Sequence, residues 1–339
     1  MNMRYVCLLL AACLVLLTAC SATSDDRLNS AVGMLNIGTP AATPATSSPP
    51  VRPCPPDYLA SLQPEWPAPS PNSMPSDTFM GTVRNQRRLI VGVDQNTKLL
   101  GYYNPNTTQY EGFDIDIANE IAKAIFGPDW PNRIRYRALL TDQRITAVQY
   151  NDVDIVADAV TVTCPRTHDV YFSNVYFMGH ERILVRKDSK TDIQSQEDLR
   201  GKPVCATRGS TALDNLKKKL PYAIPYIVGA RTDCLVALQL GQVDGILTDD
   251  AILYGFLAQD PHTKLLPGNI TDEPYGLAIS KSHPEFVRFV NAVLEQMRSD
   301  GRWTKIWNRW FGSLQIGGRS AKAPVQPRAC YKEDGCLAP

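Results

Sequence analysis

Residues 89–93 have the sequence Leu89-Ile90-Val91-Gly92-Val93, a short apolar run with the length of a buried strand. After Asp114, apolar residues recur at helical spacing, at Ile115, Ala118, Ile121, Ala122 and Ile125. The same strand-then-helix pattern recurs through residues 134–138, 144–150 and 154–160. Because strands that alternate with helices build mostly parallel sheets, this part of the chain is predicted to be an α/β domain.

A second series of apolar runs begins near Arg182 and predicts a second lobe of the same architecture. Its strands are predicted at residues 183–185, 203–206, 224–228 and 243–247. The chain then continues into two helices, predicted at 284–299 and 303–311, which resemble first-lobe material. The expected boundaries are 81–182 plus 277–316 for the first lobe and 183–276 for the second.

Length and charge restrict the class of protein. The chain has 339 residues, enough for two domains, and its hydrophobic fraction of 44% is normal for a soluble globular protein with a core. The formal net charge is +1, and the lysines and arginines are scattered along the chain. A protein that grips nucleic-acid phosphates carries a basic surplus, so no nucleic acid is expected as a partner.

The first nineteen residues have the features of a signal peptide. Arg4 precedes an apolar run over residues 6–17 that is too short to span a bilayer. The following Leu17-Thr18-Ala19-Cys20 resembles the bacterial lipobox, in which the cysteine is lipidated and becomes the first mature residue. The alternative is an ordinary secretory signal in which Cys20 is incidental. We expect an extracytoplasmic protein held at the cell membrane by acyl chains on Cys20.

Two segments outside the lobes have a different composition. Residues 20–80 combine the lipidated cysteine with a stretch rich in Pro, Ser, Thr and Ala, which offers little apolar surface to bury and is expected to be a partly extended tether. Residues 317–339 are expected to form a cysteine-containing C-terminal tail.

Six cysteines remain after the signal peptide and Cys20 are set aside, and an even number in an exported protein indicates disulfides. They are Cys54, Cys164, Cys205, Cys234, Cys330 and Cys336. Six cysteines allow fifteen pairings. We favour Cys205–Cys234, because a predicted strand and a nearby helix start place both in one lobe, and leave the other pairs open. The spacings do not suit zinc, and no metal or cofactor is expected.

Six short motifs occur in a fixed order between residues 88 and 312. They are Gly112-Phe113-Asp114-Ile115-Asp116-Ile117-Ala118, Thr161-Val162-Thr163-Cys164-Pro165-Arg166, Leu199-Arg200-Gly201-Lys202-Pro203-Val204, Gly209-Ser210-Thr211, Val243-Asp244-Gly245-Ile246-Leu247-Thr248-Asp249-Asp250, and Asp300-Gly301-Arg302-Trp303 through Trp310-Phe311-Gly312. Each motif is weak alone. Together they resemble the type II periplasmic binding proteins, and among these the family that captures polar amino acids for ABC importers.

This resemblance implies a two-lobed fold that closes around a small ligand. Two crossover strands, expected at residues 182–185 and 275–279, would form the hinge. The ligand would be glutamate or aspartate, with asparagine and glutamine as alternatives, and a monomer would deliver it to an integral-membrane permease. A sensor subunit would bind the same ligand and differ only in the membrane protein that recognises the closed state.

An amino-acid zwitterion needs a cation for its α-carboxylate and a carboxylate for its α-ammonium. Arg166 follows Thr161 after a predicted strand, and a guanidinium can hold a carboxylate through two parallel hydrogen bonds. The resemblance assigns the α-carboxylate to these two residues, with Ala159 beside them. The alternative for Arg166 is a surface arginine in a loop.

Asp249 ends a predicted strand and is the expected α-ammonium ligand. The alternative is a helix N-cap, a role that we leave to Asp250. In the same lobe, Ser210 and Thr211 open a predicted helix whose N-terminal N–H groups favour an anion. Capping by Ser210 is compatible with that role. Thr207 and Ser210 match positions that contact the ligand side chain in binders of acidic amino acids.

Arg144, with Thr141, matches an arginine that reaches the cleft in glutamate and aspartate binders. The alternative is a solvated arginine paired with Asp142 or Asp152. Asp94 ends the first strand and would repel an acidic ligand unless a cation pairs with it.

The aromatic segment that the family places after Asp94 is absent here, and Lys98 or Tyr102 is the expected replacement.

An enzyme remains a further alternative, because cyclohexadienyl dehydratases share this two-lobed fold. The four histidines are His168, His180, His262 and His283, and their spacing matches no catalytic or metal motif. The carboxylates that we place in the cleft are explained by ammonium binding rather than by proton transfer. We therefore expect a binding protein and no enzyme.

Overall fold

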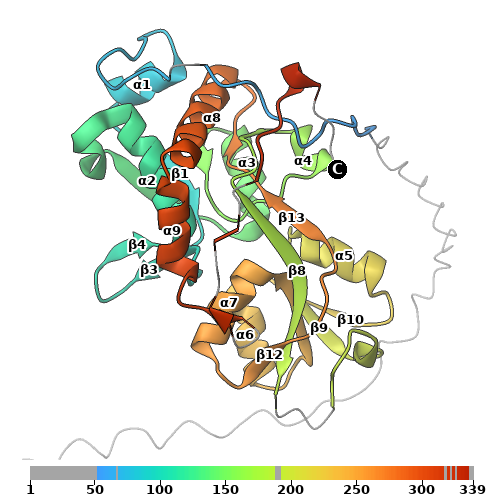
Figure 1. Ribbon diagram of the computed structural model, residues 1–339. Helices are drawn as coiled ribbons and strands as arrows, with labels where there is room; N and C mark the ends of the chain where they lie inside the picture. Colours follow the sequence, from blue (N-terminus) through green and yellow to red (C-terminus); the bar gives the residue numbers. More distant parts are fainter. Residues whose placement is uncertain are drawn as a thin grey trace, which may run out of the picture. The chain divides into compact units, whose positions relative to one another are not determined.

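The computed structural model describes residues 52–65, 68–187, 192–316, 319–320, 323–324 and 327–335 (Figure 1). The expected signal peptide, Cys20, the tether up to residue 51 and Cys336 lie outside the described residues. Within the described ranges, no helix combines the length and the apolar character that crossing a membrane requires.

The first lobe is built on a five-stranded sheet with the order β5-β1-β6-β14-β7. β1 lies in the middle of its parallel part, between β5 and β6, and β14 runs antiparallel to β6 and β7. The strands are β1 (Leu89–Val93), β5 (Ile134–Ala138), β6 (Ile155–Val156), β7 (Tyr171–Phe172) and β14 (Ala278–Ile279). A separate three-stranded sheet is formed by β2 (Asn96–Thr97), β3 (Gly101–Asn104) and β4 (Gln109–Glu111).

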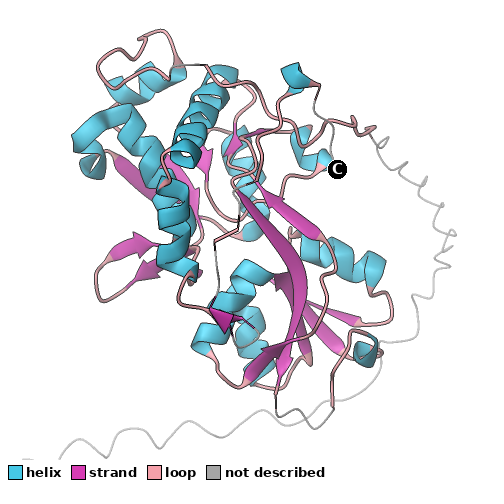
Figure 2. Ribbon diagram, in the orientation of Figure 1, coloured by secondary structure: helices cyan, strands magenta, loops and turns pink. Residues whose placement is uncertain are grey.

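Helices cover this sheet (Figure 2). The apolar side chains of Leu89, Val91 and Val93 on β1 are buried. They are α1 (Phe79–Asn85), α2 (Phe113–Phe126), α3 (Arg144–Gln149), α4 (Cys164–Thr167), α8 (Pro284–Ser299) and α9 (Arg302–Phe311). The apolar residues at helical spacing in α2 are buried, as their pattern predicts. Aromatic rings from α2, α9 and the segment before β8 meet in the core, where Phe113 packs edge-on against Trp303.

The second lobe contains a sheet with the order β10-β9-β11-β8-β12. The predicted α/β class is confirmed, because β9 is parallel to both of its neighbours and helices lie between the strands. The strands are β8 (Phe177–Arg186), β9 (Pro203–Thr207), β10 (Ile224–Val228), β11 (Gly245–Asp249) and β12 (Thr263–Leu265), and the helices are α5 (Thr211–Lys219), α6 (Arg231–Gln239) and α7 (Asp250–Gln259).

Two antiparallel strands connect the lobes, but they lie earlier in the sequence than expected. β13 (Asp272–Tyr275) pairs with the first residues of β8, where Tyr275 lies opposite Phe177 and Asp272 opposite His180. The expected hinge at residues 182–185 is instead part of the second sheet, since β8 continues without a break and pairs there with β11 (Figure 1). Likewise, residues 278–279 belong to the first sheet as β14.

The expected tether ends earlier than residue 80. Residues 52–64, here called the N-terminal strap, pack on the first lobe. Ser61 is buried, and its hydroxyl donates to the Phe172 carbonyl at 2.7 Å. Asn291 of α8 donates to the Ser61 hydroxyl at 2.8 Å, and a backbone bridge joins Ser61 to Tyr331 near the C-terminus. The predicted tether boundary at residue 80 was wrong because polar contacts and a disulfide hold this segment on the lobe. The composition of a segment indicates only how much apolar surface it can bury.

The disulfide predicted between Cys205 and Cys234 is confirmed, with 5.5 Å between the two Cα atoms. A second disulfide joins Cys54 of the N-terminal strap to Cys164, the first residue of α4. Cys330 is also disulfide-bonded. The Cys54–Cys164 bridge spans 110 residues of sequence and fixes the N-terminal strap next to the helix that carries Arg166.

Removing this bridge with the double variant C54A/C164A is expected to lower the free energy of unfolding by about 2 to 5 kcal/mol. The reason is that an unfolded chain without the bridge regains the conformational freedom of a long loop. Urea unfolding under non-reducing conditions measures the change. Equal unfolding midpoints for the variant and the wild type would show that the bridge does not stabilise the fold.

Candidate ligand-binding site between the lobes

Charged side chains from both lobes meet where their strands end, beside the crossover strands. In the first lobe Asp94 follows β1 and Asp158 follows β6, and in the second lobe Asp249 is the last residue of β11. Side chains at the carboxyl ends of parallel strands lie at one edge of a sheet, which is where open α/β sheets bind ligands. The strand order therefore gathers these side chains at one site.

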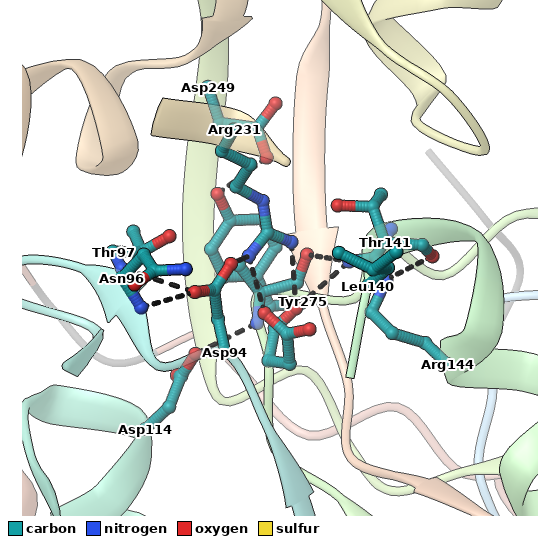
Figure 3. Close-up of polar contacts among 12 residues, drawn as sticks. Asp94, Asn96, Thr97, Asp114, Leu140, Thr141, Arg144, Arg231, Asp249 and Tyr275 are labelled. Atoms are coloured by element: carbon teal, nitrogen blue, oxygen red, sulfur yellow. Dashed lines mark hydrogen bonds and ion pairs between the residues drawn. The ribbon is translucent and has the colours of Figure 1, made fainter. Parts of the chain in front are cut away.

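The two lobes are in direct contact at this site. Arg231, the first residue of α6, lies with its Nη1 2.7 Å from Asp94 Oδ2 and 2.5 Å from Asp158 Oδ1 of the first lobe (Figure 3). Arg166 Nη2 donates to the Gly209 carbonyl of the second lobe at 3.0 Å. A Cβ on Gly209 would lie 2.6 Å from the Asp142 Cα, so only glycine allows this approach. The structure therefore represents the closed arrangement.

Arg144 is buried without a carboxylate partner. Its side chain is only 3% exposed, and its Nε donates to the Thr141 carbonyl at 2.9 Å. Its Nη1 donates to the carbonyls of Asp158 and Ala159 at 2.9 and 3.0 Å. In the described part of the chain no carboxylate oxygen lies within 4.0 Å of this guanidinium. Burial, assisted by the nearby Arg231, lowers the pKa of Arg144 to about 9.

This burial excludes the alternative of a solvated arginine. Asp152 faces Arg137 instead, at 3.5 Å.

Arg166 has a similar environment. It belongs to the short helix α4, and its Nη1 donates to the Thr161 carbonyl at 2.8 Å. Among the described residues, its hydrogen-bond acceptors are backbone carbonyls alone, and burial lowers its pKa. Arg144 and Arg166 are therefore two guanidinium groups that donate to backbone carbonyls and that, among the described residues, have no carboxylate oxygen within 4.0 Å.

Three buried carboxylates form the opposite part of the site. Asp249, Glu181 and Glu273 each have an oxygen within 4.8 Å of the others. Glu181 lies on β8 directly opposite Asp249 of β11, and Glu273 lies on the adjacent crossover strand β13. Among the described residues, no lysine or arginine forms an ion pair with any of the three.

Hydroxyl groups lie within hydrogen-bond distance of all three carboxylates. Thr271 Oγ1 is 2.7 Å from Glu273 Oε1 and 3.3 Å from Glu181 Oε2. Tyr275 Oη donates to Asp249 Oδ2 at 2.6 Å. Thr161 and Thr211 donate to Glu273 Oε2 at 2.6 and 2.8 Å. Glu181 Oε1 has no hydrogen-bond partner within the described ranges.

Burial and the charge of neighbouring carboxylates raise the pKa values of Asp249 and Glu181. Burial is the larger cause for both Asp249 and Glu181, followed by the charge of neighbouring carboxylates. The pKa of Asp249 rises to about 7 and that of Glu181 to about 8. A cation placed among these carboxylates would remove the repulsion, so this part of the site has the chemistry to receive an ammonium group.

The other predicted residues occupy varied positions. Ser210 is the N-cap of α5, where its hydroxyl accepts from the Leu213 N–H at 3.1 Å. Thr207 is buried at the end of β9, and its carbonyl accepts from the Ser210 hydroxyl. The side chain of Lys98 is exposed, and no hydrogen bond of that side chain occurs among the described residues.

The prediction that Asp250 caps α7 is wrong. Asp249 holds the N-cap position without a side-chain cap bond, and Asp250 accepts from the His180 N–H at 3.1 Å.

Sequence reasoning missed Arg231, Asp158, Glu181 and Glu273. Asp158 offered a weak signal, because it is a charged residue inside the apolar run predicted as a strand at residues 154–160. Arg231 also offered a weak signal, since it lies three positions before Cys234, at the predicted start of the helix. The two glutamates gave none, because a charged residue on a crossover strand has no periodicity that distinguishes a buried position from an exposed one.

The chain has two α/β lobes, two strands connect them, and buried charges of both signs lie between them. These features define a two-lobed solute-binding protein with the type II periplasmic binding fold. The sequence model described as bacterial extracellular solute-binding proteins, family 3, matches residues 89–313. The chain belongs to this family.

Curated relatives and solved structures agree. The ABC transporter glutamine-binding protein GlnH of Bacillus subtilis is 36% identical over 233 residues, which cover 68% of this chain and 84% of that protein. The glutamate-binding protein GluB of Corynebacterium glutamicum is 31% identical over 255 residues, covering 72% and 85%. The solved structure of the ancestral amino acid-binding protein AncCDT-1, a precursor of cyclohexadienyl dehydratase, superposes with a TM-score of 0.62 at 30% identity, covering 69% and 100%.

The raised carboxyl pKa values predict how stability depends on pH. A carboxyl group whose pKa is higher in the folded than in the unfolded protein binds its proton more tightly when folded. The ligand-free protein should therefore gain stability from Glu181, with its pKa of about 8, as the pH falls from about 8 to about 6. In Glu181→Gln, the gain in the free energy of unfolding over this pH range should be smaller by more than about 1 kcal/mol, since one pKa unit corresponds to about 1.4 kcal/mol. Urea unfolding of both proteins across this range measures the difference, and identical pH slopes would contradict the shift.

Proposed function

We propose that this chain is an extracytoplasmic, lipid-anchored receptor for an acidic amino acid, glutamate or aspartate, which it delivers to an ABC importer. Asparagine and glutamine are the alternative ligands. The observation that carries the proposal is the pair of guanidinium groups of Arg144 and Arg166, which lie in the closed cleft without a carboxylate partner. A ligand with two carboxylates would neutralise both.

The roles follow from the position of each group. Arg166 holds the α-carboxylate, and Thr161 can turn its hydroxyl from Glu273 toward the ligand. Asp249 receives the α-ammonium, with Glu181 and Glu273 close enough to share the charge. Arg144 receives the second carboxylate. Since a buried unpaired charge is costly, these contacts favour the closed form when the ligand is present.

The membrane attachment rests on the sequence. Residues 1–19 have the pattern of a signal peptide, and Cys20 follows it at the position of the lipobox cysteine. An importer receptor anchored in this way stays near its permease. The sensor alternative requires the same ligand contacts and a different membrane partner.

Catalysis is not part of the proposal. AncCDT-1 is described as an amino acid-binding protein that preceded an enzyme, so its likeness to this chain fits a binding role. His180 precedes Glu181 in the sequence, and its Nδ1 lies 3.3 Å from Asp250 Oδ2. It does not belong to the group formed by Asp249, Glu181 and Glu273.

A thermal-shift screen of all amino acids on residues 52–339 tests the ligand class. Glutamate or aspartate, or their amides, should raise the melting temperature, because a ligand that binds only the folded protein stabilises it. If only sugars, oligopeptides or metal ions raise it, the proposal is wrong.

Arg166→Ala should weaken binding of the ligand found in that screen by about 3 to 5 kcal/mol, which corresponds to more than about 100-fold. Arg137→Ala, which removes an exposed arginine of the same lobe, is the control and should leave the affinity unchanged. Calorimetric titration measures both variants. An unchanged affinity in Arg166→Ala would contradict its role.

Arg144→Met should discriminate between glutamate and glutamine. If Arg144 holds the second carboxylate, its loss should weaken the binding of glutamate at least about tenfold more than the binding of glutamine. The reason is that a charge-assisted hydrogen bond is roughly twice as strong as a neutral one. Parallel titrations of both ligands measure the ratio. Equal losses for the two ligands would place the second carboxylate elsewhere.

A further inference from the structure

Arg231 is the most completely neutralised cation of the site. Its side chain, with that of Asp94 and that of Asp158, forms a group of three charges that we call the Arg231 bridge. Their residues are 5%, 8% and 2% exposed. Arg231 Nη1 contacts both carboxylates, and its Nη2 lies 3.3 Å from the Asp158 carbonyl oxygen. No other residue of α6 contacts a carboxylate of the first lobe in the described part of the structure.

The two carboxylates are fixed toward this cation. The N–H groups of Asn96 and Thr97 donate to Asp94 Oδ1 at 2.6 and 3.2 Å, which leaves Oδ2 for Arg231. Asp158 follows β6 in the same sheet, and its Oδ2 has no partner among the described residues. Two buried carboxylates that share one place repel each other strongly unless a cation lies between them.

Arg231 keeps its charge in this setting. Burial alone lowers its pKa, but Asp158 and Asp94 raise it by more, so the net shift is upward. Arg231 therefore remains a cation between the two carboxyl groups.

The Arg231 bridge adjoins the part of the cleft where we place the ligand side chain. Arg144 Nη1 donates to the carbonyl of Asp158, while Arg231 binds the carboxylate of the same residue (Figure 3). Arg231 also contributes to the lowered pKa of Arg144, as expected for two neighbouring cations. The side chain of a bound amino acid that reaches Arg144 therefore ends beside the bridge.

We propose that Arg231 is a specificity-determining residue. Its guanidinium group occupies the place where the side chain of a basic amino acid would otherwise bind. This inference rests on the proposed function. With Arg231 present, Asp94 and Asp158 both pair with a cation of the protein, so a ligand lysine or arginine would meet the guanidinium groups of Arg144 and Arg231. Without it, the two carboxylates form a site for an ammonium or guanidinium group.

The Arg231 bridge also links ligand choice to closure. Arg231 belongs to the second lobe and both carboxylates to the first, so the ion pairs exist only when the lobes meet. A basic ligand that competed for the carboxylates would have to displace this contact. An acidic ligand leaves it intact.

The test compares three variants that differ only in the carboxylates left after Arg231 is removed. R231M keeps both, R231M/D158N keeps Asp94 alone, and R231M/D94N/D158N keeps neither. Calorimetric titrations with L-glutamate, L-glutamine, L-lysine and L-arginine, with melting temperatures as a check of folding, are carried out on each and on the wild type.

The wild type should bind glutamate and reject both basic amino acids. Variants that retain a carboxylate should bind lysine or arginine at least tenfold more tightly than the wild type does, and this gain should vanish in the triple variant. R231M/D158N keeps the test decisive if R231M does not fold, because it buries one carboxylate instead of two.

The outcomes separate this inference from the proposed function. If the wild type binds no acidic amino acid or amide, the proposed function fails whatever the variants do. If the wild type binds glutamate but no folded variant with a carboxylate gains affinity for lysine or arginine, the role of Arg231 is overturned. Gain of basic-ligand binding in the triple variant would also overturn it, because Asp94 and Asp158 are then absent.

Discussion

Charge buried between the two lobes is the constraint on which the rest of the site depends. Removing a charged group from water costs several kcal/mol unless an opposite charge and hydrogen bonds compensate for it. The Arg231 bridge has this compensation within the protein. Arg144, Arg166 and the carboxylates around Asp249 do not have it among the described residues. Closing the empty cleft is therefore costly, and under the proposed function a zwitterion with an added carboxylate would supply charges of both signs to the closed form.

The fold places the two kinds of charge in different structural elements. The arginines belong to short helices of the first lobe, whereas Glu181 and Glu273 lie on β8 and β13, the strands that connect the lobes. In the proposed assignment, the ligand's ammonium group would contact the connection between the lobes, while its carboxylates would contact one lobe. A ligand changes the balance between open and closed forms only by binding one form more tightly, and the carboxylates on the crossover strands provide such a difference.

Sequence patterns predicted the elements well where the signal is local. The strand at residues 89–93 and the helix α8 have the predicted bounds, and Cys205 pairs with Cys234 as expected. The N-terminal strap was missed because Ser61 and Cys54 attach it to residues more than 100 positions away, through contacts without any periodic signal.

The candidate site was predicted in the same uneven way. Arg166, Thr161 and Asp249 stand in motifs, and the structure places them near one another. Arg166 donates to the Thr161 carbonyl, the Thr161 hydroxyl donates to Glu273, and Asp249 has an oxygen within 4.8 Å of Glu273. Whether Asp94 would repel an acidic ligand depended on a partner 137 positions away, which only the folded structure identifies as Arg231. Burial of Glu181 depends on its pairing opposite Asp249, which the register of two distant strands determines.

The most direct test of this account is the number of protons that the protein releases when it binds its amino acid. Titration calorimetry at about pH 7 in two buffers with different ionisation enthalpies measures this number. Asp249 and Glu181, whose pKa values are about 7 and about 8 in the ligand-free protein, should lose protons when an ammonium group enters between them. The account predicts net proton release on binding. Binding heats that are the same in both buffers would mean that no proton is exchanged and would contradict the assignment of the ammonium group to these carboxylates.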